Sequence, residues 1–418
     1  MSPVIGDVVQ WRATTPTDEI DGGLLLNTSP TTAVRLSPLE LAARIVPIAA
    51  VLALAGVWER SLPVFGEIVV VALLGACVIA AVHHAEVVAH RVGEPYGSLI
   101  LAVAVTVIEV GLIVTLMISG GPGSASLARD TVFAAVMITC NGILGLSLLI
   151  SALRNGTAAF NAKGTAPALA SVLTLATLSL VLPTFTTSVP GPEFSGVQLA
   201  FAAVASLALY VLFLFVQNIR HRDYFLPVQP STSHAPQSAV GAAPTGQPPA
   251  DAGDQEADTD DHAAVPSART TLISLALLVM ALVAVVGLAK VESKTIEAAV
   301  TGAGLPHSVV GVVIALLVLM PETLAAARNA HRKRTQISLN LALGSAMASI
   351  ALTIPTIALA SIWLDGPLLL GLGATHIVLL GLTAVVGALT VIPGRATLLQ
   401  AGVHLTLCAS YLFLAAVP

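Results

Sequence analysis

The chain has 418 residues, of which 56% are hydrophobic and 10% are charged, with a net charge of -5 and a mean hydropathy of +0.91. A soluble globular surface needs far more charged residues, so this composition excludes a water-soluble domain. The apolar residues form runs of about twenty, the length at which a helix crosses the hydrocarbon core of a bilayer. Alternating ten-residue strands are absent, which argues against an outer-membrane barrel. The composition therefore predicts an all-α integral membrane protein.

The first segment, residues 1–38, mixes Asp, Glu, Thr and Pro and has no basic region ahead of a short apolar core. We therefore expect a cytoplasmic N-terminal segment, not a cleaved signal peptide. Beyond it, apolar runs separated by charged or Pro/Gly-rich breaks predict eleven membrane helices. Their expected ranges are 40–58, 64–84, 96–118, 131–152, 167–187, 197–217, 270–289, 307–328, 338–362, 368–392 and 396–416.

A long polar segment, residues 220–269, separates the sixth apolar run from the seventh. It is rich in Pro, Ala, Ser and Gln, a composition typical of a disordered linker. An acidic cluster lies within it, made of Asp251, Asp254, Glu256, Asp258, Asp260 and Asp261. Weak Ca2+ binding is one interpretation of this cluster. A solvated cytoplasmic linker is favoured, because the spacing and the glycine of an EF-hand loop are missing.

The positions of Lys and Arg predict the orientation of the helices. When each is assigned to one end of the eleven-helix arrangement, fourteen lie on the side of the N-terminus and the linker, and four lie on the other side. The positive-inside rule then places the N-terminus and the linker in the cytoplasm and Pro418 outside. We expect a multi-pass protein of the inner membrane.

The helices divide into two sets at the linker. If residues 39–62 form an extra first helix, residues 63–219 and 270–418 contain five helices each. An odd number of crossings per set makes the sets inverted relative to each other, a plan common among secondary transporters. The fold class that we predict is one extra N-terminal helix plus two inverted five-helix repeats.

Two acidic residues lie near the middle of predicted membrane helices, Glu109 and Glu322, each in the second helix of its set. A carboxylate at that depth costs several kcal/mol unless it is protonated, paired or hydrated, so we favour a functional role over a structural hydrogen bond. Pro321 frees the carbonyl of Leu317, which adds an oxygen of the kind that Na+, K+ and Ca2+ prefer, although a kink for packing is the alternative. If the two acids meet, a cation and protons compete for them, and this competition is sufficient for exchange.

The third helix of each set contains an asparagine followed by a glycine four residues later. The pairs are Asn141 with Gly145 and Asn340 with Gly344. The asparagines can supply side-chain carbonyl oxygens, whereas helix packing alone is an open alternative for the glycines. The residues expected to bind cation and proton are Glu109, Glu322, Asn141, Asn340, Thr106 and Ser345, and those expected to break or pack helices are Pro321, Gly145 and Gly344.

The second predicted helix ends in a cluster of titratable residues. His83, Glu86 and His90 lie about one and two turns apart on one helical face. pH sensing or proton access is one interpretation. A solvated helix end is the simpler interpretation and is favoured.

The acids and their flanking residues resemble the two alpha repeats of the cation/Ca2+ exchanger superfamily. The resemblance rests on Gly97-Ser98-Leu99-Ile100 ahead of Glu109, and on Pro321-Glu322 leading to Leu341-Ala342-Leu343-Gly344-Ser345-Ala346-Met347 and Ile354-Pro355. It covers about residues 64–416 and is greatest to the bacterial branch of Ca2+/H+ and Na+(K+)/H+ antiporters. It implies that Glu109 and Glu322 bind cation and proton alternately, with Asn141 and Gly344-Ser345 at matching positions.

The chain also departs from that family pattern. Val105-Thr106 and Val318-Leu319 stand where many relatives have Gly-Asn, and Ala348 stands where a glutamine is frequent. Fewer oxygen ligands are therefore visible. Because Ca2+ takes six to eight oxygens, these departures leave room for Na+ or K+ as the transported cation.

The function that we expect is secondary antiport of Ca2+ and/or Na+/K+ for protons across a bacterial inner membrane. A Na+/Ca2+ exchanger without proton coupling and a cation channel remain alternatives. An intramembrane hydrolase is disfavoured, because His-Glu-x-x-His and Gly-x-Ser-Gly are absent. We expect no enzyme activity and no cofactor apart from the transported cation and protons. The expected partners are inorganic cations and lipid, not nucleic acid, and the oligomeric state is left open.

Overall fold

We describe a computed structural model of the chain, over residues 38–58, 60, 62–93, 96–119, 124–227, 266–363 and 366–418. The expected N-terminal segment 1–38 lies almost wholly outside these residues, and so does most of the expected linker, including its acidic cluster. The described residues are almost entirely helical and belong to one unit, Pro38–Pro418.

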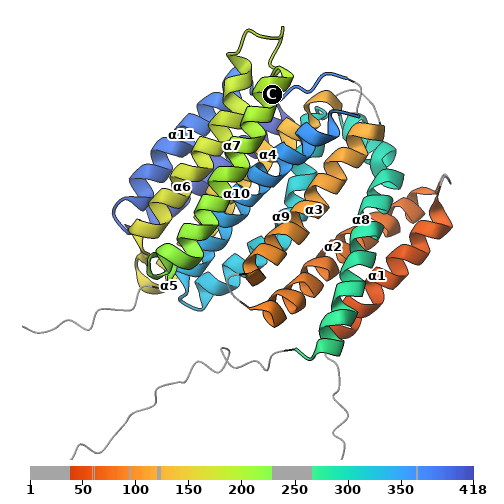
Figure 1. Ribbon diagram of the computed structural model, residues 1–418, viewed down its shortest axis with the longest axis horizontal. Helices are drawn as coiled ribbons and strands as arrows, with labels where there is room; N and C mark the ends of the chain where they lie inside the picture. The colour runs from red at the N-terminus through yellow and green to blue at the C-terminus, as the bar shows by residue number, and fades with distance from the viewer. Residues whose placement is uncertain are drawn as a thin grey trace, which may run out of the picture. The chain divides into compact units, whose positions relative to one another are not determined.

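The described part of the chain contains twelve α-helices (Figure 1). They are α1 (Pro38–Val57), α2 (Val64–Val92), α3 (Tyr96–Ser119), α4 (Leu127–Met137), α5 (Leu144–Asn155), α6 (Ala162–Ala176), α7 (Gly196–Phe215), α8 (Ala268–Gly302), α9 (Ser308–His331), α10 (Thr335–Ala360), α11 (Ala374–Val391) and α12 (Leu398–Ala416). The π-helix Ile138–Ile143 joins α4 to α5, so these two form one crossing. Two further π-helices, Thr177–Val181 and Val216–Arg220, extend α6 and α7.

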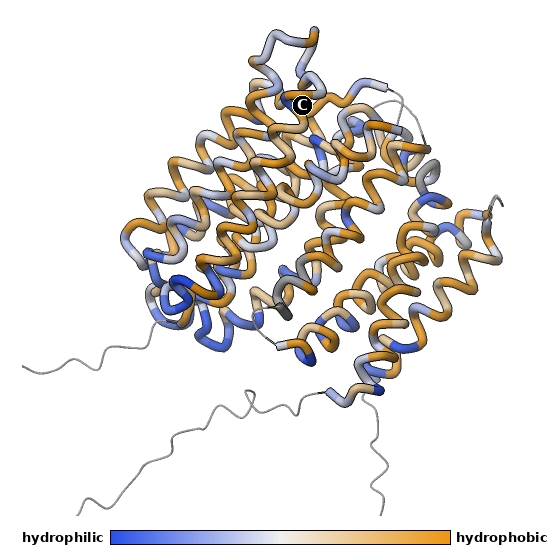
Figure 2. The backbone as a smooth tube through the Cα atoms, in the orientation of Figure 1, coloured by the Kyte–Doolittle hydropathy of each residue, from blue (hydrophilic) through white to orange (hydrophobic). Residues whose placement is uncertain are grey.

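The membrane helices agree with the predicted crossings. Ten stretches of the described chain are long and apolar enough to cross a bilayer. The helix α3 adds a shorter described apolar stretch, Val103–Ile118, within its 24 residues. Figure 2 shows the hydrophobic length of these helices with hydrophilic residues near their ends. The prediction of a multi-pass helical membrane protein is confirmed.

The last helix of each five-helix set begins with the same local signal. Ser195 and Gln198 form a capping box at the start of α7, and Thr397 and Gln400 form one at the start of α12. In such a box each side chain satisfies a backbone N–H that the first helical turn leaves free. The two helices are five crossings apart, and each is the last of its half in the predicted arrangement of inverted repeats.

Contacts between connecting segments define the two ends of the helix bundle. The short strands β1 (Ala158–Ala159) and β2 (Arg395–Ala396) pair antiparallel, so the segments after α5 and after α11 lie at one end. At the same end, Arg154 donates a hydrogen bond to the ring of His331 at 2.8 Å. We call this the linker end, because α7 ends there and α8 begins there, and we call the opposite one the far end.

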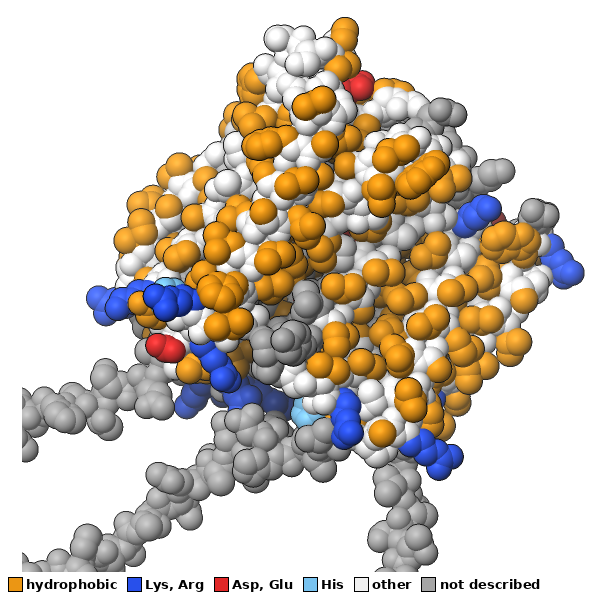
Figure 3. All heavy atoms as spheres, in the orientation of Figure 1, with side chains coloured by type: hydrophobic (Ala, Val, Ile, Leu, Met, Phe, Trp, Pro, Cys, Tyr) orange, Lys and Arg blue, Asp and Glu red, His pale blue; other side chains and the backbone are white. Residues whose placement is uncertain are grey.

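Basic side chains gather at the linker end. In Figure 3 most of the Lys and Arg side chains lie along the lower edge, where α5 ends and α8 begins in Figure 1. The described basic residues at the linker end are Arg44, Arg91, Arg154, Lys163, Arg220, Arg222, Arg269, Arg328, Arg332, Lys333, Arg334 and Arg395, and those at the far end include Arg60, Arg129 and Lys290. The bundle therefore has the charge asymmetry on which the orientation was predicted.

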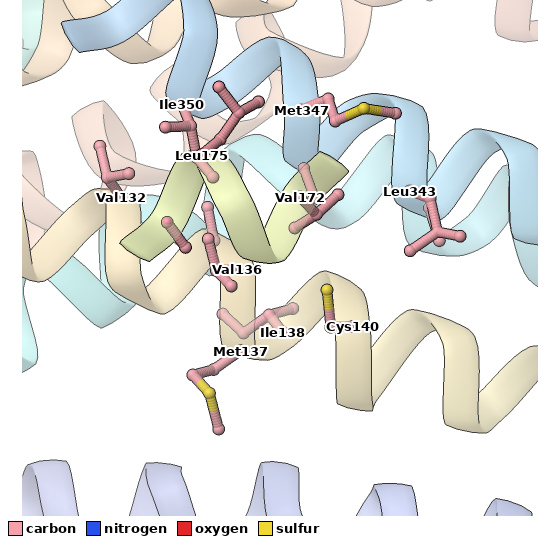
Figure 4. Packing of buried hydrophobic residues seen from close by; sticks show 14 of the residues in the cluster. Val132, Val136, Met137, Ile138, Cys140, Val172, Leu175, Leu343, Met347 and Ile350 are labelled. Atoms are coloured by element: carbon pink, nitrogen blue, oxygen red, sulfur yellow. The ribbon is translucent and has the colours of Figure 1, made fainter. Parts of the chain in front are cut away.

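Two groups of buried apolar residues hold the bundle together. One joins α4, α6, α9 and α10, with Val136, Val172 and Met347 among its members (Figure 4). The other joins α1, α2, α3 and α8. Lipid is as apolar as these side chains, so close van der Waals packing holds the helices together. Small residues permit such packing, and a Cβ added at Gly311 of α9 would lie 2.9 Å from backbone atoms of Asp130 and Thr131.

This close approach makes Gly311 a sensitive position. We expect Gly311→Ala to lower the free energy of unfolding by about 1–3 kcal/mol, because the added methyl group forces α9 away from α4. Gly381→Ala is the matched control, since a Cβ there meets nothing within 4 Å. Alanine is the better helix former, so the control should be neutral or slightly stabilising. Thermal unfolding in detergent measures both variants, and equal stabilities would contradict the packing argument.

Candidate cation and proton site

Glu109 and Glu322 line one cavity of about 290 Å³. Glu109 lies on α3 and is 4% exposed, and Glu322 lies on α9 and is 8% exposed. The helix α10 packs against both α3 and α9 and supplies much of the remaining lining. Of the residues expected to bind cation and proton, the cavity brings together Thr106, Glu109, Glu322, Asn340 and Ser345.

Glu109 has a hydrogen-bond donor from the opposite half of the chain. The hydroxyl of Ser349, on α10, donates to Oε1 of Glu109 at 2.6 Å. Ser349 is itself 3% exposed, so this contact is largely buried at the cavity wall. A hydroxyl that donates to a carboxylate stabilises its ionised form, and such charge-assisted bonds are about twice as strong as neutral ones.

Glu322 is less well satisfied. Its Oε2 atom is buried and has no hydrogen-bond partner in the described part of the chain. A buried oxygen without a partner costs about 1–3 kcal/mol, and more if it is charged. Glu322 also lies close enough to Glu109 for the two carboxylates to interact electrostatically. A proton or a cation between them would remove both penalties.

The proline before Glu322 does not break its helix. The helix α9 runs through Pro321 from Ser308 to His331. Leu317, whose carbonyl loses its helical donor at this proline, is not among the lining residues of the cavity. The cavity therefore does not use the carbonyl oxygen that the sequence suggested as a ligand.

Asn340 lies at the edge of the cavity, and both the nitrogen and the oxygen of its side-chain amide form hydrogen bonds. Its Nδ2 donates to the carbonyl of Phe225 at 2.6 Å, and its Oδ1 accepts from Nε2 of Gln336 at 2.8 Å. One turn farther along α10, a Cβ at Gly344 would have no atom within 4 Å, so open space lies beside it. Ser345 follows directly and offers a hydroxyl.

Asn141 lies outside this cavity. It sits in the π-helix between α4 and α5, where its Nδ2 donates to the hydroxyl of Thr383 at 2.9 Å and its Oδ1 lies 3.1 Å from Nδ1 of His404. Gly145 is close-packed beside it, because an added Cβ would come within 3.0 Å of the Cβ of His404. The corresponding motifs therefore differ: Asn141 and Gly145 seal α5 against α12, whereas Asn340 and Gly344 border the cavity.

The titratable cluster on α2 lies at the linker end. Glu86 is exposed and close enough to Glu322 and to Arg328 for electrostatic interaction. His83 is half-buried and also interacts with Glu86, whereas His90 is exposed one turn farther along. Glu86 thus lies between the solvated end of α2 and the buried acid.

The cavity extends from the two acids toward the linker end. Toward the far end, its lining stops at Glu109 on α3 and at Ser349 on α10. The lining residues nearest the linker end are Ile337 and Gln217. A separate apolar groove of about 560 Å³ lies between α3 and α10, next to Thr106. Thr106 lines both spaces, so its side chain forms part of the wall between them.

Sequence reasoning missed several lining residues. Ser349 lies one turn after Ser345, and its hydroxyl could have been noticed there, but the family pattern singles out only its neighbour Ala348. Tyr210 lies in α7, which is apolar nearly throughout. Gln217 lies in the π-helical extension of α7, next to the polar linker, where polar residues are no signal for a site. Their position depends on how α7 packs against α10, which local sequence does not determine.

Comparison with known proteins shows where this arrangement belongs. The family described as sodium/calcium exchanger protein matches residues 62–218 and 273–417. The chain belongs to this family. The match includes both acids and leaves out α1 and the segment between the two halves. Membership of an exchanger family, within the cation/Ca2+ exchanger superfamily, agrees with a transporter and not with an enzyme.

Two bacterial relatives are similar to this exchanger over most of their length. The putative ionic transporter y4hA of Sinorhizobium fredii is 43% identical over 350 residues, which cover 83% of the chain and 87% of the relative. The sodium-potassium/proton antiporter ChaA of Escherichia coli is 32% identical over 356 residues, 85% of the chain and 90% of the relative.

Solved structures share the fold of this exchanger at low sequence identity. The structure of native YfkE matches with a TM-score of 0.62 and 14% identity, over 91% of this chain and all of the other. The H+/Ca2+ exchanger CAX matches with a TM-score of 0.59 and 14% identity, over 90% of this chain and 91% of the other. These similarities support the helical architecture.

The cavity can be tested by its accessibility to water. We expect a cysteine at Ser345 to react with a small hydrophilic thiol reagent, because this side chain lines the cavity that extends to the linker end. A cysteine at Thr383 is the control and should stay unreactive, since Thr383 is fully buried in the polar contact with Asn141. The native cysteines Cys77, Cys140 and Cys408 are buried and give the background rate. Equal labelling at the two positions would contradict the cavity.

Proposed function

We propose that this chain is a secondary antiporter that exchanges a cation for protons and uses Glu109 and Glu322 as a shared site. The observation that carries this proposal is the single cavity that contains both carboxylates, one of them with an unpartnered oxygen. Each acid comes from a different half of the chain. The similarity to ChaA, named a sodium-potassium/proton antiporter, supports the pairing of cation and proton transport.

Competition between cation and protons provides the mechanism. A bound cation favours two ionised carboxylates, whereas protons neutralise the repulsion between them when the cation is absent. A site that must be filled by one or the other, and that faces each side of the membrane in turn, couples the two fluxes. The empty site with both carboxylates ionised has the highest free energy. The protein therefore does not readily turn this site from one side of the membrane to the other without a bound cation or protons.

The relatives, and not the number of oxygens, favour a monovalent cation. Besides the four carboxylate oxygens, the cavity lining includes the hydroxyl-bearing residues Thr106, Tyr210, Ser345 and Ser349 and the amide of Gln217. These oxygens are numerous enough for the six to eight that Ca2+ takes, so the lining by itself does not select between the cations. The chain is 32% identical to ChaA, which is named a sodium-potassium/proton antiporter. From this similarity we infer that Na+ or K+ is transported in preference to Ca2+.

The orientation and the subdivision of the chain are part of the proposal. Basic side chains at the linker end support a cytoplasmic linker end in a bacterial inner membrane, with the N-terminus cytoplasmic and Pro418 outside. The repeated capping boxes support halves at 63–219 and 270–418, with 39–62 as the extra helix and 220–269 as the linker. Glu86, with His83 and His90 about one turn to either side of it, is then the cytoplasmic access route for protons.

Reconstitution tests the function. In proteoliposomes that contain the purified chain, an imposed pH gradient alone should drive uptake of Na+ or K+, with weaker uptake of Ca2+. No cation flux under a pH gradient would contradict the proposal. Na+-driven Ca2+ flux without proton movement would establish the exchanger alternative, and a steady uncoupled conductance would establish the channel alternative.

The two acids should each be essential for exchange. We expect Glu109→Gln and Glu322→Gln each to abolish proton-coupled cation flux, because the amide neither ionises nor carries a proton in its place. Glu193→Gln is the control, since Glu193 lies in the segment before α7 at the far end and is outside the cavity lining. Flux assays on variants with normal yields in the membrane give the answer, and near-normal exchange by either site variant would remove that residue from the mechanism.

Ser349 should tune the site without being essential. Its hydroxyl favours the ionised form of Glu109, and hydrogen bonds to charged groups are worth about 1.5–3 kcal/mol. Water can replace part of this contact, so we expect Ser349→Ala to lower the apparent cation affinity about tenfold, most strongly at low pH, where protons compete best. Ser349→Thr retains the hydroxyl and should stay near normal. Equal affinities in the two variants would argue against the hydrogen bond.

A further inference from the structure

A second pair of acidic residues lies away from the transport cavity, at the far end of the bundle. Glu67 is in the first turn of α2, and Glu292 is on α8. Neither lines the cavity that contains Glu109 and Glu322. Glu292 is only 1% exposed, and its Oε2 atom has no hydrogen-bond partner in the described part of the chain. The transport mechanism does not use this buried carboxylate.

The helix geometry directs Glu292 toward Glu67. Glu292 and Thr295 are three residues apart and therefore lie on the same face of α8. The hydroxyl of Thr295 donates to Oε1 of Glu67 at 3.3 Å, so this face is turned to the first turn of α2. The two carboxylates are close enough to interact electrostatically. Glu67 is partly exposed, so water and ions can reach the pair from the far end.

The helices themselves stabilise only one of these charges. The N-terminus of α2 carries a partial positive charge that favours Glu67 in its first turn. Glu292 is well inside the 35-residue α8 and gains nothing comparable. The ammonium group of Lys290 lies 5.0 Å from the centre of the Trp58 ring, which directs it toward the segment after α1. The buried oxygen of Glu292 therefore has no charged partner on these helices, and either a proton or a bound cation would compensate it.

We propose that Glu67, Glu292 and Thr295 bind a hard divalent cation, Ca2+ or Mg2+, at the far end of α2 and α8. Two carboxylates and a hydroxyl are oxygen ligands of the type that these ions prefer, and water completes the coordination shell. With so few protein ligands, the affinity belongs in the range of extracellular Ca2+ modules, about 10⁻⁴–10⁻³ M. The ion joins the first helices of the two halves, which pack closely against each other.

Mn2+ binding tests the site in the whole protein. The background is the full chain in lipid nanodiscs, with Glu109→Gln, Glu322→Gln and the six acids of the linker cluster replaced by their amides, so that neither the transport acids nor the cluster can bind the probe. Titration with Mn2+, followed by the electron paramagnetic resonance signal of the free ion, should show one site that Ca2+ or Mg2+ displaces. Adding Glu292→Gln should weaken Mn2+ binding at least about tenfold, because it removes one of two charged ligands. Adding Glu297→Gln, on the same helix, should change nothing.

The outcomes separate this site from transport. Undetectable Mn2+ binding in the background protein, or equal binding with and without Glu292→Gln, overturns the proposal. If Glu292→Gln does not fold, the half-buried Glu67→Gln decides in its place, with the same expected loss. As a second readout, Ca2+ should raise the thermal unfolding temperature of the background protein but not that of the Glu67→Gln variant. Because the background lacks the transport acids, the result is independent of whether the chain exchanges cations for protons.

Discussion

The cost of holding two carboxylates in the middle of a membrane governs the arrangement of this protein. Each charge costs several kcal/mol in hydrocarbon unless something compensates it. The structure compensates Glu109 with the hydroxyl of Ser349 and leaves one oxygen of Glu322 without a partner in the described part of the chain. The helices α3, α9 and α10 must pack closely for the acids to share a cavity. An incompletely satisfied pair is unfavourable for stability, but under the proposed mechanism it is the condition that lets a cation and protons compete for the site.

Much of the fold follows from the sequence because lipid imposes simple rules. A crossing needs about twenty apolar residues, so the membrane helices could be predicted from composition and spacing. A charge within such a run is rare, so Glu109 and Glu322 could be identified from the sequence alone. Their pairing followed from the inverted-repeat interpretation, which depends on the long polar segment between the two halves.

The rest of the site could not be predicted, because it depends on contacts between distant helices. Asn141 and Asn340 occupy the same local motif, yet one bonds Thr383 and lies against His404 while the other borders the cavity. Nothing within either motif distinguishes these environments. Serines are common in membrane helices, so the role of Ser349 depends on the packing of α10 against α3, which its local sequence does not reveal. The buried Glu292 was overlooked for a related reason, since it lies near the end of an apolar run where acids are ordinary.

The contrast between Gly145 and Gly344 has an energetic consequence. The first glycine lies in a close-packed contact and the second lines the cavity, although the two belong to equivalent helices of the predicted repeats. A rearrangement that opened the first pair and sealed the second would exchange one packing for its counterpart. Its free-energy change would be a difference between two similar terms, not the full cost of separating two helices. A tenfold ion gradient supplies about 1.4 kcal/mol, which is enough to bias such a balanced pair of states.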